Sequence, residues 1–256
     1  MASEVLVPSS PAEAVELFGD GAGTTVVGGG TVVVPEMSYG RLHPARVLLL
    51  TRAGLAGITT AGTTVTIGAT TSVGALIELE GHVAALAACA RNVADYEVRG
   101  QATVGGNLCG HGDLQACLLA LDATARSTGA GGVRTEPLEE FLANRGGRLL
   151  LDVTFELPAA SAFVVLDYPH THEYTVLAVT GVRTAGGDTR LAATGVAGAG
   201  ARLRSAEALA SDPDAAAAAA ASDVTFVDDA LASAWYREQT LPVLVRRVLN
   251  QLEESA

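Results

Sequence analysis

The chain has 256 residues, of which 49% are hydrophobic and 17% are charged, so it can bury a core and is not disordered throughout. Its formal net charge of −12 argues against a nucleic-acid partner, because phosphate binding needs a basic surface. All 16 basic residues are arginine, which excludes a Schiff-base lysine, a lysine general base and a P-loop lysine.

The cysteine count and the N-terminal sequence indicate in which cellular compartment the protein is expected. Cys89, Cys109 and Cys117 are the three cysteines and form no CxxC pair, which argues against a disulfide framework, a zinc knuckle and a four-cysteine iron–sulfur cluster. The first 20 residues have neither the basic nor the apolar region of a signal peptide. No apolar run reaches the roughly 18 residues that a membrane span needs. We therefore expect a cytoplasmic protein.

The first part of the chain predicts a small α/β unit that ends near residue 53. Ser9 or Ser10 followed by Pro11 predicts a capped helix over 8–20. A β-branched strand over 24–27 then meets three glycines. A second β-branched run ends at Pro35 and is expected to be extended. A short buried strand follows over 47–50.

The middle part, 54–160, alternates helical and extended patterns. The expected elements are strands and turns over 57–69, helices over 72–79 and 83–95, a strand and glycine turn over 98–108, a buried helix over 114–123, a loop or hairpin with a short helix over 126–140, and a strand over 149–157.

The last part, 161–256, has a different pattern. We expect strands, or a mixture of strands and helix, over 163–168, 174–183 and 189–195, a helix start over 201–209, a polyalanine helix over 214–221 and an amphipathic helix over 235–252. The apolar face of that last helix is expected to contain Trp235, Leu241, Leu244, Val245, Val248 and Leu252.

Two glycine motifs are the best candidates for binding chemistry. They are Val27-Gly28-Gly29-Gly30-Thr31 and Thr103-Val104-Gly105-Gly106-Asn107. Each alone is explained by a tight turn. Glycine also lets the backbone approach phosphate oxygens closely, through positive φ or the lack of a side chain. The first motif lies between two β-branched runs, which disfavours a dinucleotide-binding turn that opens a helix. Together, the two motifs indicate two backbone clamps on one pyrophosphate.

Longer motifs resemble a known family. The sequences GGTVVVPEMS (29–38), IGATT (67–71), VRGQATVGGNL (98–108), DLQACLLALDA (113–123) and WYR (235–237) resemble those of the FAD-binding, or medium, subunits of the molybdenum hydroxylases. The pair TVGGN and LLALDA is the specific part. The chain departs from the family at Gln101-Ala102, where Arg-Gly is usual, in a shortened stretch between Leu108 and Asp113, and at Asp167, His172 and Thr175.

The resemblance implies an α+β fold. This fold has the FAD-binding architecture of the PCMH/vanillyl-alcohol-oxidase type, with two α/β subdomains (1–53 and 54–160) followed by a small α+β C-terminal domain (161–256). FAD is the implied cofactor. The implied cofactor-binding residues are Val26, Val27, Gly28, Gly29, Gly30, Thr31, Val32, Val33, Thr103, Val104, Gly105, Gly106, Asn107, Asp113, Asp152 and Asp167.

The implied function is electron transfer from the iron–sulfur clusters of a partner, through FAD, to an acceptor. The implied partners are a [2Fe–2S] subunit and a molybdopterin subunit, with a homo-oligomer also possible, and no metal site or catalytic residue is assigned to this chain. The alternatives are a stand-alone FAD-dependent oxidoreductase for a small organic molecule and a non-catalytic assembly subunit. The pairs His170/His172 and Tyr168/Tyr174, and Cys109 with His111, are better explained by packing or surface positions than by chemistry.

Overall fold

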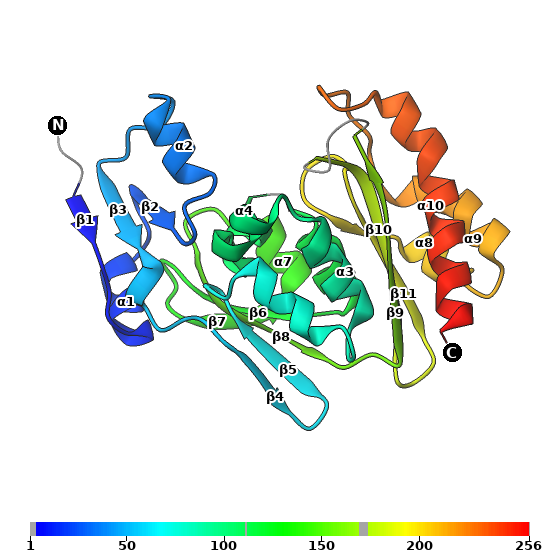
Figure 1. The fold of residues 1–256 in the computed structure, drawn as a ribbon, viewed down its shortest axis with the longest axis horizontal. Helices are drawn as coiled ribbons and strands as arrows, with labels where there is room; N and C mark the ends of the chain where they lie inside the picture. The colour runs from blue at the N-terminus through cyan, green and yellow to red at the C-terminus, as the bar shows by residue number, and fades with distance from the viewer. Residues whose placement is uncertain (1–3, 111, 169–173, 256) are drawn as a thin grey trace. The chain divides into compact units, whose positions relative to one another are not determined.

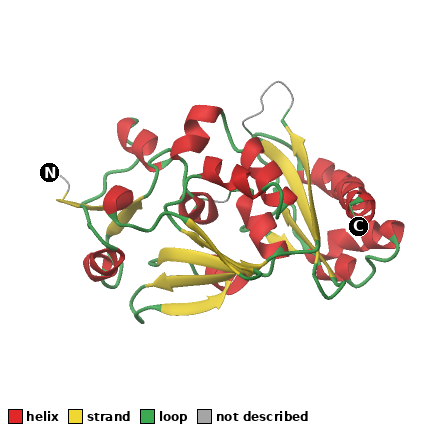
Figure 2. Ribbon diagram, turned by 60° about the horizontal axis from the view of Figure 1, so that its bottom comes forward, coloured by secondary structure: helices red, strands yellow, loops and turns green. Residues whose placement is uncertain are grey.

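The computed structural model describes residues 4–110, 112–168 and 174–255 (Figure 1). Strands and helices both contribute throughout the chain (Figure 2), which confirms the predicted α+β class. The chain forms two compact units. The first comprises Met1–Ala75, Tyr96–Gly110 and Thr124–Phe155, and the second comprises Leu76–Asp95, His111–Ala123 and Glu156–Ala256.

The first unit begins with a three-stranded parallel sheet in the order β1-β3-β2. Its strands are β1 (Glu4–Leu6), β2 (Thr24–Val27) and β3 (Arg46–Leu49). Helix α1 (Pro11–Phe18) packs here, and the predicted cap is Ser10, whose side chain accepts a hydrogen bond from the Glu13 amide. Ala14 and Phe18 of this helix are buried with Leu48.

The run after the first glycines is a helix, not the predicted strand. α2 (Val33–Ser38) begins where the Val34 amide donates to the Gly30 carbonyl at 3.0 Å. Pro35 lies in its first turn, where a missing amide hydrogen has no cost. Within the described residues this run pairs with no strand, and the helix forms despite the β preference of its β-branched residues.

A five-stranded sheet forms the rest of the first unit, in the order β4-β5-β8-β6-β7. The elements are η1 (Leu50–Arg52), β4 (Ile58–Ala61), β5 (Thr64–Gly68), β6 (Thr124–Thr128), β7 (Arg134–Pro137), α7 (Leu138–Ala143) and β8 (Leu149–Glu156). For this segment the sequence predicted either a loop or a hairpin, and the structure shows a hairpin of β6 and β7.

The second glycine motif is also helical, where a strand and turn were predicted. The segment 98–108 falls in α4 (Tyr96–Gln101) and α5 (Val104–Cys109), and only Thr103 makes a strand-like bridge, to Ser72. Thr103 instead caps α5 by accepting from the Gly106 amide at 3.1 Å.

The second unit contains an antiparallel sheet in the order β12-β11-β10-β9. Its elements are α3 (Ala84–Asn92), α6 (Leu114–Ala120), β9 (Ala160–Asp167), β10 (Thr175–Arg183), β11 (Thr189–Thr194), β12 (Ala201–Arg202), α8 (Arg204–Glu207), α9 (Pro213–Ala219), η3 (Ala220–Asp223) and α10 (Ala234–Glu254); η2 (Val73–Leu79) precedes α3.

Helices cover both faces of β10. The Thr180 hydroxyl lies 3.2 Å from the Cys117 thiol of α6, whereas a Cβ on the neighbouring Gly181 would lie 2.9 Å from Leu252 of α10. Successive residues of a strand point to opposite faces, so α6 and α10 lie on opposite sides of this sheet. This arrangement explains why Val176–Val182 is buried throughout.

The C-terminal helix confirms most of the predicted apolar face. Leu241, Leu244, Val245, Val248 and Leu252 are all buried. Trp235 was wrongly included, because its side chain is 68% exposed in the first turn of α10. The predicted helix start over 201–209 is the short strand β12 followed by α8.

The sheets follow one another along the chain, and both predicted domain boundaries fall near a change of sheet, after β3 and at the start of β9. The two units are nevertheless discontinuous, because 76–95 and 111–123 belong to the second. The three-domain division therefore stays a prediction. Among the residues that the structure describes, no helix is long and apolar enough to cross a membrane.

Candidate functional site

A cavity of about 360 Å³ in the first unit brings the two glycine motifs together. Its walls come from β2, η1, the residues just after β5, α5 with its cap Thr103, the 145–148 turn and the start of β8. The lining residues are Val26, Gly28, Leu50, Ala69, Thr70, Thr103, Gly105, Gly106, Cys109, Arg145, Gly146, Arg148, Leu149 and Leu150.

The first glycine loop presents backbone donors. Within the described residues, the amides from Gly29 to Val33 donate to no protein acceptor. Only Gly30 has positive φ, +75°, which turns the chain toward α2. A run of unpaired amides in a turn is a typical concave anion site.

The loop approaches the second motif too closely for side chains. A Cβ on Gly29 would lie 1.8 Å from the Gln101 carbonyl oxygen, and a Cβ on Gly28 would lie 2.7 Å from the Thr103 hydroxyl. Neither glycine has positive φ. Contact with the Gln101 backbone therefore requires glycine at position 29, and contact with the Thr103 side chain favours glycine at position 28, whereas φ requires neither.

The second motif contributes differently. The Val104 and Gly105 amides donate to the carbonyls of Thr71 (2.9 Å) and Ala69 (2.8 Å), and the Gly106 amide donates to Thr103. These donors are therefore used within the protein. The sequence suggested that this motif would supply a second set of free amides for the pyrophosphate. The motif instead forms part of the cavity wall at Gly105 and Gly106, where no side chain blocks a ligand.

Two arginines in the cavity wall were missed by the sequence analysis. Arg145 donates from Nε to the Cys109 carbonyl (3.2 Å) and from Nη1 to the Leu142 carbonyl (2.6 Å), and Arg148 lines the same cavity. The signal available was Arg145-Gly-Gly-Arg148 directly before a strand. Burial raises the pKa of the Cys109 thiol, and Arg145 opposes this only in part, so the thiol stays protonated and does not favour nucleophilic chemistry.

The predicted residues of the first unit divide into two groups. Those that line the cavity are Val26, Gly28, Thr103, Gly105 and Gly106. Those that do not line it but lie in or directly after the same motifs are Val27, Gly29, Gly30, Thr31, Val32, Val33, Val104 and Asn107. Asp152 of β8 instead forms an ion pair with Arg126 of β6, while Leu149 and Leu150 of the same strand line the cavity.

Asp113 and Asp167 belong to the second unit, where one hydrogen-bonded network links them. The carboxylate of Asp113 accepts from the hydroxyls of Thr175 (2.5 Å) and Thr194 (2.9 Å). The Asn92 side-chain amide donates to both Asp167 and Thr175 at 3.2 Å. Thr175, noted as a family departure, is therefore a member of the network, whereas His111, His170 and His172 lie outside the described residues.

Burial raises the pKa of Asp113, the two threonine hydroxyls lower it, and the charge of Asp167 raises it. The folded state thus holds the Asp113 proton more tightly than the unfolded state. Its ionisation is expected to reduce stability as the pH rises from 3.8 through the raised pKa. Urea midpoints should show that the wild type gains stability relative to Asp113→Asn as the pH falls through this window. A pH-independent difference would contradict the burial of the charge.

Comparisons of sequence with known proteins match the first part of the chain and about half of its length. Residues 1–156 match the model of the family described as the FAD binding domain in molybdopterin dehydrogenase. The carbon monoxide dehydrogenase medium chain of Hydrogenophaga pseudoflava is 34% identical over 146 residues, which is 54% of this chain and 51% of that one. The chain therefore aligns with about half the length of this curated relative.

Solved structures extend the likeness. Carbon monoxide dehydrogenase from Hydrogenophaga pseudoflava, which lacks the Mo-pyranopterin moiety, matches with a TM-score of 0.90 and 27% identity over 100% of this chain and 99% of that one. Reconstituted CO dehydrogenase from Oligotropha carboxidovorans matches with a TM-score of 0.90 and 25% sequence identity, over 100% of this chain and 99% of that one. Quinoline 2-oxidoreductase from Pseudomonas putida 86 matches with a TM-score of 0.87 over 100% of this chain and 98% of that one. Its sequence identity is only 19%, so this likeness shows the fold alone.

The family model covers more than half of the chain, including both glycine motifs, and FAD is the cofactor that it names. The chain belongs to the family of FAD binding domains of molybdopterin dehydrogenases.

Proposed function

We propose that this chain is the FAD-binding electron-transfer subunit of a molybdenum hydroxylase-type oxidoreductase. The observation that carries the proposal is the cavity of the first unit, which Gly28, Gly105, Gly106 and two arginines line, with the unpaired amides of Gly29–Val33 directly following Gly28 in the chain. The likeness to the two carbon monoxide dehydrogenase structures over essentially the full chain supports the same function.

The residues present fit a dinucleotide. The Gly29–Val33 amides can donate to pyrophosphate oxygens, and the missing side chains at Gly28, Gly105 and Gly106 let those oxygens approach the backbone. Arg145 adds a positive charge for the phosphates. The cavity volume of about 360 Å³ lies within the range of roughly 300–1,000 Å³ found for cofactor and ligand pockets.

When bound, FAD supplies the link between one-electron and two-electron transfer. The protein's own part is to bind and orient the cofactor. The apolar side chains of Val26, Leu50, Leu149 and Leu150 exclude water from the cavity wall, which strengthens the hydrogen bonds of the loop amides. Electron transfer needs no acid or base from the chain, so we assign no catalytic residue.

The sixteen residues predicted from the resemblance remain our proposed cofactor-binding set. The loop 26–33 and the Thr103–Asn107 motif would hold the pyrophosphate, Asp113 the adenosine side, and the segment around Asp152 the flavin region through its backbone. Asp167 completes the set. We place greatest weight on the first loop, because its Gly29–Val33 amides have no acceptor in the described chain.

The proposed partners are a [2Fe–2S] subunit and a molybdopterin subunit. The curated relative is named as the medium chain of its enzyme, and the described residues contain no group of three or more His, Cys, Asp or Glu that could hold a metal ion. The other redox centres would therefore lie on separate chains. We place the complex in the cytoplasm, with a homo-oligomer as one possible arrangement.

A stand-alone flavoenzyme for a small organic molecule is the second candidate. It is favoured by the linked carboxylates of Asp113 and Asp167, since Asp167 and Thr175 are positions where the chain departs from its family. A non-catalytic assembly subunit is the third alternative, and cofactor content separates it from the other two.

The purified protein is expected to be yellow and to release FAD, not FMN, on denaturation. Two glycine motifs at one cavity suit a pyrophosphate, which FMN lacks. Chromatography of the released flavin measures this directly. A colourless protein that FAD cannot reconstitute would contradict the proposal.

Co-expression with the neighbouring genes tests the partners. We expect an iron–sulfur protein to copurify in constant ratio and reduced clusters to transfer electrons to the bound flavin. A chain that remains alone, yet oxidises an organic substrate, would replace the first candidate with the second.

A further inference from the structure

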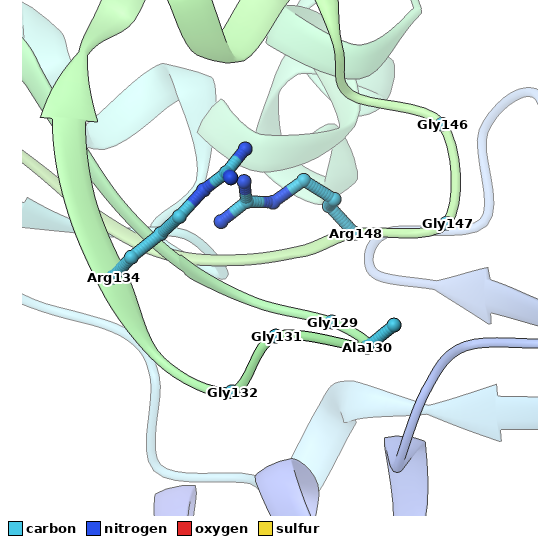
Figure 3. A pocket seen from close by; sticks show the side chains of 8 residues that line it. All are labelled: Gly129, Ala130, Gly131, Gly132, Arg134, Gly146, Gly147 and Arg148. Carbon is cyan, nitrogen blue, oxygen red and sulfur yellow. The ribbon is translucent and has the colours of Figure 1, made fainter.

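A second cavity of about 210 Å³ lies in the first unit, between the turn of the β6–β7 hairpin and the turn before β8. Figure 3 shows its walls. It is lined by Gly129, Ala130, Gly131, Gly132, Arg134, Gly146, Gly147 and Arg148. Six of these eight residues are glycine or alanine, so backbone and two arginine side chains form almost the entire surface.

The two arginines give this cavity a positive wall. Figure 3 shows the guanidinium groups of Arg134 and Arg148 pointing toward one another. They share one carboxylate: Glu136 lies 3.0 Å from Nη2 of Arg134 and 2.8 Å from Nη1 of Arg148. Two cations facing one anion leave the cluster with a net charge of about +1.

Arg148 has an unused donor. Its side chain is only 8% exposed, and its Nη2 donates to the Ser127 hydroxyl at 2.5 Å. Its Nε is buried and has no hydrogen-bond partner in the described part of the chain. Buried charged donors without an acceptor are rare, so Arg148 has one hydrogen-bonding position that its neighbours in the described chain leave unused.

The glycines keep the cavity open. A Cβ on Gly131, Gly132 or Gly146 would meet nothing within 4 Å. A Cβ on Gly129, by contrast, would lie 2.9 Å from the Gly147 carbonyl, so the two turns pack closely at that point. The result is an accessible pocket held by a fixed contact between its two turns.

We propose that this cavity binds a small tetrahedral oxyanion of the phosphate class, either free or as the phosphate group of a small metabolite. Arginine forks match phosphate oxygens in geometry and charge. The volume of about 210 Å³ equals that of about seven water molecules at roughly 30 Å³ each, which suits a phosphate with a small substituent. The inference does not depend on the proposed electron-transfer function.

The site shares a wall with the cofactor cavity, because Arg148 lines both. An oxyanion held there would also help fix the Arg148 side chain beside the cofactor. The two sites have different walls otherwise, with only Gly146 and Arg148 in common.

Calorimetric titration of the protein with inorganic phosphate, as purified and after saturation with FAD, tests the inference. Arg134→Gln is expected to weaken phosphate binding at least about tenfold, the usual effect of losing a charge-assisted hydrogen bond. Glu136→Gln should strengthen it severalfold, because the competing carboxylate is removed. If Glu136→Gln merely disturbed the structure, it would weaken phosphate binding. A gain of affinity in Glu136→Gln together with a loss in Arg134→Gln therefore indicates that phosphate binds the two arginines directly.

Arg126→Gln is the matched control. Arg126 lies on β6 of the same sheet, pairs with Asp152 and does not line the cavity, so its loss should leave phosphate affinity unchanged. Sulfate should displace phosphate, and acetate should not. Equal binding by wild type, Arg134→Gln and Arg126→Gln would overturn the proposal. Loss of phosphate binding on FAD saturation would also overturn it, by assigning the contact to the cofactor.

Discussion

Gly29→Ala is expected to reduce FAD affinity by roughly a hundredfold, because overpacking of this kind costs about 1–3 kcal/mol and each 1.4 kcal/mol is a factor of ten. The added Cβ would lie 1.8 Å from the Gln101 carbonyl oxygen and 3.2 Å from Cα of Ala102. Both are backbone atoms that cannot rotate away. The loop must therefore move, and its unpaired amides move with it.

Fluorescence titration of the apoprotein with FAD measures this effect. Gly100→Ala is the matched control, since it lies in α4 of the neighbouring motif and its Cβ would meet nothing within 4 Å. Gly105→Ala should be intermediate, because its Cβ would lie 3.0 Å from the Ala69 carbonyl. If Gly29→Ala and Gly100→Ala retain FAD equally, the first loop is not the pyrophosphate site.

Arg237→Met is expected to lower the free energy of unfolding of the second unit by about 3–5 kcal/mol. Arg237 is 1% exposed. It donates to the carbonyls of Val176 (3.1 Å), Val227 (2.6 Å) and Ala232 (3.2 Å) and to Asp229 (2.7 Å). Methionine keeps the hydrocarbon part but leaves these acceptors without a donor.

Urea unfolding, followed by circular dichroism and by the fluorescence of the single Trp235, measures the loss. Arg247→Met on the exposed face of α10 is the control and should change stability by no more than about 0.5 kcal/mol. A similar small change for Arg237→Met would show that water replaces the guanidinium, and that this arginine does not hold α10 to β10.

The glycine motifs illustrate how far sequence reasoning reaches. Their position, their pairing and the need for glycine were predictable, as was the family that the longer motifs resemble. Their conformation was not. Both motifs lead into helices, and the predicted positive φ applies to Gly30 alone. Gly29 and Gly105 lie close to backbone carbonyls, and Gly28 and Gly106 lie close to the Thr103 hydroxyl.

The errors in predicting the second motif and the start of α10 have the same cause, which is that contacts with distant residues decide the local structure. In the second motif, carbonyls of Ala69 and Thr71, more than 30 residues away along the chain, accept the amides of Gly105 and Val104 and fix the start of α5. In α10, the period of apolar residues was correct from Leu241 onward, but no neighbour covers Trp235. β-Propensity and helical periodicity describe a segment, and the partner that satisfies its donors or buries its face lies elsewhere.

The sequence by itself determined the α+β class, most elements and their order, the cofactor expected from the resemblance and the two loops that line its cavity. Only the tertiary structure decided which amides remain available. The Val104 and Gly105 amides of one motif donate to distant carbonyls, whereas the Gly29–Val33 amides that follow the start of the other have no acceptor among the described residues. It also placed Arg145 and Arg148 at the cavity. Hydrogen bonding is directional and short-ranged, so these assignments depend on contacts that spacing along the chain does not encode.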